Sequence, residues 1–139
     1  MKRIASLILP AKLEHLPAFI ATVTGAAESG RVAPKKVFNV ELALEEALVN
    51  IMNYAYEGKA GDIEVVCRSD NREWFVVEII DSGKAFDVTS VPPPDLTTDL
   101  SDRKVGGLGL LFIKRLIDGA VYRREGEKNV LELRISLNS

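Results

Sequence analysis

The sequence is poor in the residues that form disulfides and zinc sites. It has one cysteine, Cys67, and one histidine, His15. A single cysteine cannot form an internal disulfide, and one histidine without a cysteine cluster does not supply the ligands of a zinc site. We therefore expect Cys67 to be a small core residue and His15 to lie at the surface or to cap a helix.

Long hydrophobic runs and an excess of one charge are also missing. The chain has 18 basic and 20 acidic residues, which are well mixed. This balance offers no basic patch for nucleic acid, and no apolar run is long enough to span a bilayer. Pro10 and Lys12 interrupt the apolar start, which favours a first strand over a signal peptide. We expect a cytoplasmic protein that binds neither nucleic acid nor a membrane.

The residues that are present indicate one domain over positions 1–139, with 47% hydrophobic residues to fill its core. Apolar periodicity predicts strands at 2–8, 62–69, 73–80, 119–125 and 129–136, and helices at 13–30, 34–57 and 109–118. An irregular segment from about Val88 to Val105 suggests a functional lid or disorder. This order predicts an α+β two-layer sandwich, whose mixed, mainly antiparallel sheet carries about three helices on one face.

The second predicted helix contains "VELALEEALVNIMNYAYEG" and carries a narrow polar sector. Steps of about 100° per residue place Glu46, Asn50, Asn53 and Glu57 together, beside a wide apolar arc that includes Phe38. The sector either faces water or lines a cleft. In a cleft, a carboxylate and an amide one turn apart can share a metal ion or a water molecule.

Asp81 directly follows the apolar strand "EWFVVEII" and opens the loop "DSGKAFD". A carboxylate at a buried strand end can accept a hydrogen bond from an exocyclic amine such as that of adenine. Gly83 would let the chain turn beside a flat ring. The alternative is an ordinary turn that contains Asp and Gly.

Gly106, Gly107 and Gly109 open the third predicted helix. Free backbone N–H groups and the helix dipole attract phosphate at such a position, although a tightly packed glycine loop is the alternative. Arg103 and Lys104 precede the glycines and either approach the phosphates or remain solvated. The sequence has no Walker lysine–serine pattern.

These features together resemble the GHKL superfamily of ATPases and kinases, which has the Bergerat fold. The resemblance covers the whole chain and consists of a Glu-x₃-Asn helix, a strand ending in Asp-x-Gly, a long lid and a Gly-x-Gly helix. The forms "DSGKAFD" and "GGLGLLFIKRLID" are similar to those of bacterial anti-sigma factor serine/threonine kinases.

The resemblance implies a role for each matching residue. Glu46 would activate the attacking hydroxyl, because Glu46 and not Glu45 lies one turn before an asparagine. Asn50 would bind the Mg²⁺ that bridges the ATP phosphates, Asp81 would hold the adenine amine, and Gly83 would shape the pocket. The other residues expected to contact the nucleotide are Asn53, Lys104, Gly106, Gly107, Leu108, Gly109 and Leu110.

The chain also departs from the family pattern at three positions. Tyr54 stands where many relatives have histidine, and Ala85 where many have a second glycine. Glu132 stands about where many have an adenine-side threonine. These departures concern the finer contacts of the pocket.

The resemblance implies an ATP- and Mg²⁺-dependent protein kinase that phosphorylates a serine or threonine of an anti-sigma antagonist (STAS-type) protein. It also implies a sigma factor as a further partner and a homodimer. The alternative is a binding module that sequesters a sigma factor or another regulator, with nucleotide only tuning its surface. A sensor histidine kinase fragment is less suitable, because the sequence leaves no room for a dimerisation helix pair.

Overall fold

The computed structural model describes residues 1–90, 113 and 115–138. Its strands are β1 (Lys2–Pro10), β2 (Asp62–Ser69), β3 (Trp74–Asp81), β4 (Gly119–Glu125) and β5 (Lys128–Ser136). Its helices are α1 (Leu16–Ser29) and α2 (Pro34–Asn50), and single turns of helix occupy Leu13–His15, Ile51–Ala55 and Val88–Ser90. Pro17 and Pro34 lie in the first turns of α1 and α2, where a missing backbone N–H removes no helical hydrogen bond.

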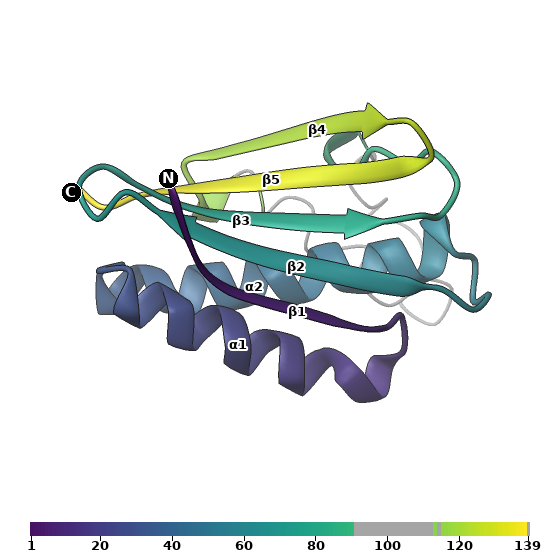
Figure 1. Cartoon of the computed structure of the whole chain (residues 1–139), viewed down its shortest axis with the longest axis horizontal. Helices are drawn as coiled ribbons and strands as arrows, with labels where there is room; N and C mark the ends of the chain where they lie inside the picture. Colours follow the sequence, from purple (N-terminus) through teal and green to yellow (C-terminus); the bar gives the residue numbers. More distant parts are fainter. Residues whose placement is uncertain (91–112, 114, 139) are drawn as a thin grey trace, which may run out of the picture.

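The strands form one sheet in the order β1-β2-β3-β5-β4, and every neighbouring pair is antiparallel. Helices α1 and α2 lie against one face of this sheet (Figure 1). The predicted two-layer α+β arrangement is therefore confirmed, with a sheet that is antiparallel, not mixed, in its described strands. Half of the predicted third helix lies outside the described residues. No described helix is both long and apolar enough to cross a membrane.

The core lies between the helices and the sheet. Alternate residues of β3 point toward the helices, and Phe75, Val77 and Ile79 are fully buried there. Val40 and Leu44 meet them from one stripe of α2. Phe38 is 61% exposed, so its predicted place in the buried arc is wrong. It lies two residues before Val40, about 200° around the helix, and faces away from the sheet.

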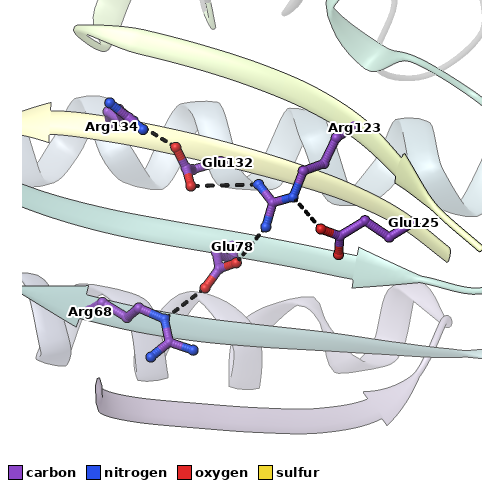
Figure 2. Close-up of polar contacts among 6 residues, drawn as sticks. All are labelled: Arg68, Glu78, Arg123, Glu125, Glu132 and Arg134. Atoms are coloured by element: carbon purple, nitrogen blue, oxygen red, sulfur yellow. Dashed lines mark hydrogen bonds and ion pairs between the residues drawn. The ribbon is translucent and has the colours of Figure 1, made fainter. Parts of the chain in front are cut away.

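The opposite face of the sheet carries a network of charged side chains (Figure 2). Glu78 of β3 and Glu132 of β5 stand directly across from each other, which would repel without compensation. Arg68 approaches Glu78 at 2.8 Å, and Arg134 approaches Glu132 at 2.6 Å. Arg123 lies between the two carboxylates and reaches Glu78 at 3.1 Å and Glu132 at 3.6 Å. Each carboxylate is therefore matched by two arginines.

This charge network covers apolar residues of the same face. The residues are Val66, Val76 and Val130, which are only 2–3% exposed although they point away from the helices. Long arginine and glutamate side chains can shield such residues with their aliphatic stems while keeping the charges in water. Glu132 is thus part of an outer-face network, on the side of the sheet away from the helices.

Candidate functional site

The C-terminal end of α2 is held against the segment that follows β3. The α-helix ends at Asn50 and continues as one π turn over Ile51–Ala55. The carbonyl oxygen of Ala55 accepts a hydrogen bond of 3.0 Å from the backbone N–H of Lys84. A Cβ atom on Gly83 would lie 2.6 Å from that same oxygen. Only glycine therefore permits this close approach, which the sequence pattern had assigned to a flat ring.

Tyr56 also connects the end of α2 to the segment that follows β3, through hydrogen bonds of its hydroxyl. Its hydroxyl donates a hydrogen bond to the carbonyl of Asp62 and accepts one of 2.8 Å from the backbone N–H of Ser82. Burial raises the pKa of this phenol, and the nearby carboxylates of Asp81 and Asp62 raise it further. Tyr56 is thus a neutral link between the end of α2, the start of β2 and the end of β3.

Asn50 presents an unused oxygen. The residue is fully buried, and its Nδ2 donates to the carbonyl of Glu46 at 2.8 Å and to Oε1 of Glu46 at 2.9 Å. Its Oδ1 has no hydrogen-bond partner in the part of the chain that the structure describes. A buried polar atom without a partner costs free energy and is rare in native proteins.

The oxygen ligands available here suit Mg²⁺ that is shared with a bound phosphate, and they do not suit a metal ion held by protein side chains alone. The described residues contain no group of three or more His, Cys, Asp or Glu side chains that could hold a metal ion. Mg²⁺ prefers oxygen ligands and is commonly bound by one or two protein oxygens together with substrate phosphates and water. The orphaned Oδ1 of Asn50 is one such oxygen.

Asp81 presents a second open oxygen. The residue is 2% exposed, and its Oδ1 accepts hydrogen bonds of 2.9 Å from both the backbone N–H of Gly83 and Nδ2 of Asn129. No described residue donates a hydrogen bond to Oδ2. Burial raises the pKa of this carboxyl, while the two hydrogen bonds and the charge of Arg124 partly offset the rise. When ionised, Oδ2 can accept a hydrogen bond from an amine.

The sequence analysis missed Asn129, which stands directly opposite Asp81 in the sheet. Besides its bond to Asp81, its Nδ2 donates to the carbonyl of Lys84 at 2.8 Å. Its Oδ1 accepts from the backbone N–H of Phe86 at 3.2 Å and from the hydroxyl of Tyr122. The available signal was a polar residue at the start of a strand whose other core-facing positions are apolar.

The remaining predicted residues fall into two groups. Asn53 is exposed on the π turn, and neighbouring Tyr54 stacks on Phe86 with ring centroids 5.2 Å apart. The structure pairs Glu46 with Asn50 on α2 and Asp81 with Gly83 after β3, and it packs Gly83 against the Ala55 carbonyl that follows α2. The predicted residues Lys104, Gly106, Gly107, Leu108, Gly109 and Leu110 lie outside the described residues, as does the lid beyond Ser90.

Comparison with known proteins agrees with this fold. The histidine kinase-like ATPase domain matches residues 9–135. The serine-protein kinase RsbW of Listeria monocytogenes serovar 1/2a is 29% identical over 134 residues, which cover 91% of this chain and 83% of the relative. RsbW of Bacillus thuringiensis is 30% identical over 115 residues, which cover 79% and 71%. The chain belongs to the histidine kinase-like ATPase domain family, which implies that it binds ATP.

Proposed function

We propose that this chain is a protein kinase that binds ATP with Mg²⁺ and transfers the γ-phosphoryl group to a serine or threonine of an anti-sigma antagonist protein of the STAS type. The observation that carries the proposal is the pair on α2, in which the buried amide of Asn50 keeps an open oxygen and holds the carboxylate of Glu46 one turn away. The related proteins that are named serine-protein kinases support the choice of acceptor.

The proposal assigns one task to each side chain. Asp81 accepts a hydrogen bond from the adenine amine through Oδ2, and Asn50 offers Oδ1 to the metal. Bound Mg²⁺ supplies charge neutralisation for the phosphates. Glu46 orients the incoming hydroxyl and accepts its proton, which is the role of a general base. Its bond to Asn50 keeps the carboxylate and the metal ligand in fixed relation.

The resemblance to anti-sigma factor kinases leads us to propose a sigma factor as a further partner and a homodimer as the working form. Gel filtration and co-purification with the candidate sigma factor test these two points independently of phosphotransfer. The alternative, a nucleotide-tuned binding module, would keep both interactions and lack transfer.

The decisive experiment compares Glu46→Gln with Glu45→Gln, a matched change on an exposed neighbour. Glutamine at 46 can still accept the Asn50 hydrogen bond but cannot take a proton. We expect ATP affinity near that of the wild type and a loss of phosphotransfer of at least about 100-fold, as is typical for removal of a general base. Glu45→Gln should change neither quantity.

The assay uses labelled ATP, Mg²⁺ and the candidate antagonist protein. Equal transfer by the wild type and Glu46→Gln would disprove the catalytic role of Glu46. A wild type that binds ATP but phosphorylates no antagonist of this type would favour the binding module.

A further inference from the structure

Asn129 uses every hydrogen-bonding position of its side chain. An asparagine side chain has two N–H donors and an oxygen that can accept two hydrogen bonds. The donors serve Oδ1 of Asp81 and the carbonyl of Lys84, while the oxygen receives the backbone N–H of Phe86 and the Tyr122 hydroxyl. The residue is 3% exposed, so water cannot easily replace a lost partner.

These partners permit only one orientation of the amide. If it were rotated by 180°, its NH₂ group would face the N–H of Phe86, and its oxygen would face the carboxylate of Asp81. Both contacts would be repulsive. Asn129 thus always presents a donor to Oδ1 of Asp81, together with the donor from Gly83. The open position of the carboxylate is therefore always Oδ2.

We propose that Asn129 is a positioning residue that makes this site select adenine over guanine nucleotides, by holding Asp81 in one orientation with Oδ2 open. The inference rests on the proposed ATP binding. Adenine carries an amine donor where guanine carries the oxygen acceptor O6. An ionised carboxylate can only accept, so it attracts the adenine amine and repels the guanine oxygen. A protonated carboxyl can donate to O6 and loses this discrimination.

The surroundings of Asp81 make the contribution of Asn129 necessary. Burial favours the neutral form of this carboxyl, so its pKa is raised overall. Arg124 is the cation that acts against this rise, and it also donates to the carbonyl of Gly83 at 2.9 Å. Tyr56 stays neutral and therefore adds no negative charge near Asp81. Loss of the Asn129 donor therefore raises the pKa of Asp81 further.

The test measures dissociation constants of Mg-ATP and Mg-GTP by calorimetry for the wild type, Asn129→Ala and Asn129→Asp. Asn138→Asp is the matched control, because Asn138 is exposed near the end of the chain. Loss of one hydrogen bond to a charged group predicts about tenfold weaker ATP binding in Asn129→Ala. GTP binding should fall less, so the ratio of the two constants narrows. Asn129→Asp should lose more, because it places a second carboxylate against Oδ1.

The pH dependence separates positioning from a merely structural role. ATP affinity should fall as the pH drops through the pKa of Asp81, and this fall should begin at a higher pH in Asn129→Ala. Tyr122→Phe keeps the ring and removes only the hydroxyl donor to Asn129. Tyr122→Phe should change the ratio of the ATP and GTP dissociation constants, and the pH dependence of ATP affinity, in the same direction as Asn129→Ala but by a smaller amount. It also tests the proposal if substitutions at position 129 prevent folding.

The outcomes are distinct. A wild type that binds neither nucleotide would overturn the proposed function and this inference with it. A wild type that prefers ATP, with folded variants at 129 or Tyr122→Phe that keep its ATP-to-GTP ratio and pH profile, would overturn the inference alone.

Discussion

The polar side chains on the two sides of the sheet differ in how completely they are matched, and we call them the outer cluster (Glu78, Glu132 and their arginines) and the helix-side cluster (Asn50 of α2 and Asp81 of β3). On the outer face, Glu78 and Glu132 are each matched by arginines at 2.6–3.6 Å. On the helix side, Asn50 and Asp81 are buried, and their hydrogen bonds occupy only one oxygen or nitrogen of each side chain. The outer cluster is internally complete, whereas the helix-side cluster leaves two oxygens open.

The carboxylates of the two clusters respond to burial in opposite ways. Burial acts to raise the pKa of Glu78, but the hydrogen bonds and charges of Arg68 and Arg123 outweigh it and lower the pKa overall. Burial raises the pKa of Asp81, and its neighbours only partly offset the rise. The lowered pKa of Glu78 means that its ionised form favours the folded state, whereas the raised pKa of Asp81 means that its ionised form is disfavoured there.

The largest expected effect is on ATP binding, from a change at Asp81 in the helix-side cluster. Asp81→Asn should weaken ATP binding by more than about 100-fold, because a buried donor would then face the adenine amine. The amide cannot avoid this by rotation, since Gly83 and Asn129 both require an oxygen at the Oδ1 position. Calorimetry with Mg-ATP measures the change. Asp62→Asn, at an exposed site, is the control, and equal affinity of the two variants would show that Asp81 does not contact the base.

A smaller effect is expected at Gly83, where the segment after β3 contacts the Ala55 carbonyl that follows α2. Gly83→Ala places a methyl group 2.6 Å from the Ala55 carbonyl oxygen and should lower the free energy of unfolding by about 1–3 kcal/mol. Gly25→Ala is the contrasting change, because no heavy atom lies within 4 Å of the added group and alanine favours α1. It should stabilise the protein by up to about 1 kcal/mol. Urea unfolding of both variants measures the contrast, and a neutral Gly83→Ala would refute the close approach.

The smallest effect is expected in the outer cluster, at Glu78. Glu78→Gln should lower the free energy of unfolding at neutral pH by less than about 1 kcal/mol, because the ion pairs are partly solvated. Since the folded-state pKa of Glu78 is lowered, its contribution is present above the ordinary carboxyl pKa and disappears as the pH falls through the lowered value. Urea unfolding at pH 7 and at about pH 3 tests this. The ATP affinity of Glu78→Gln should equal that of the wild type. A different affinity would show that the outer cluster influences nucleotide binding.

The sequence was informative where the signal is local. Periodicity located the described helices and strands to within a few residues, since burial on one side of an element repeats along that element. Glu46 and Asn50 are one turn apart on the same helix, and Asp81 directly follows an apolar strand, so each could be recognised without knowing the sheet. The resemblance then connected these segments.

The contact between Asn129 and Asp81 was not predicted because it depends on strand register. Asn129 meets Asp81 across 48 positions of sequence, and this contact exists only because β5 begins at Lys128 after a two-residue turn. The apolar pattern of the sequence does not specify which residues of β3 and β5 stand opposite each other. Glu132 lies three positions after Asn129, and an odd step along a strand leads to the other face. Glu132 therefore belongs to the outer network, whereas Asn129 faces the helix side.

The π turn at Ile51–Ala55 has a consequence for insertions and deletions in this chain. A π turn holds one more residue than an α-helical turn of similar rise, so it delays everything that follows by about 100° of rotation. Rewinding all five residues of Ile51–Ala55 as regular α-helix would therefore turn the Ala55 carbonyl away from Lys84. Deleting one of them would not, because four α-helical residues advance by nearly the same angle as the five residues of the π turn. The extra residue thus sets the angle between Asn50 and the Ala55 carbonyl that meets Lys84.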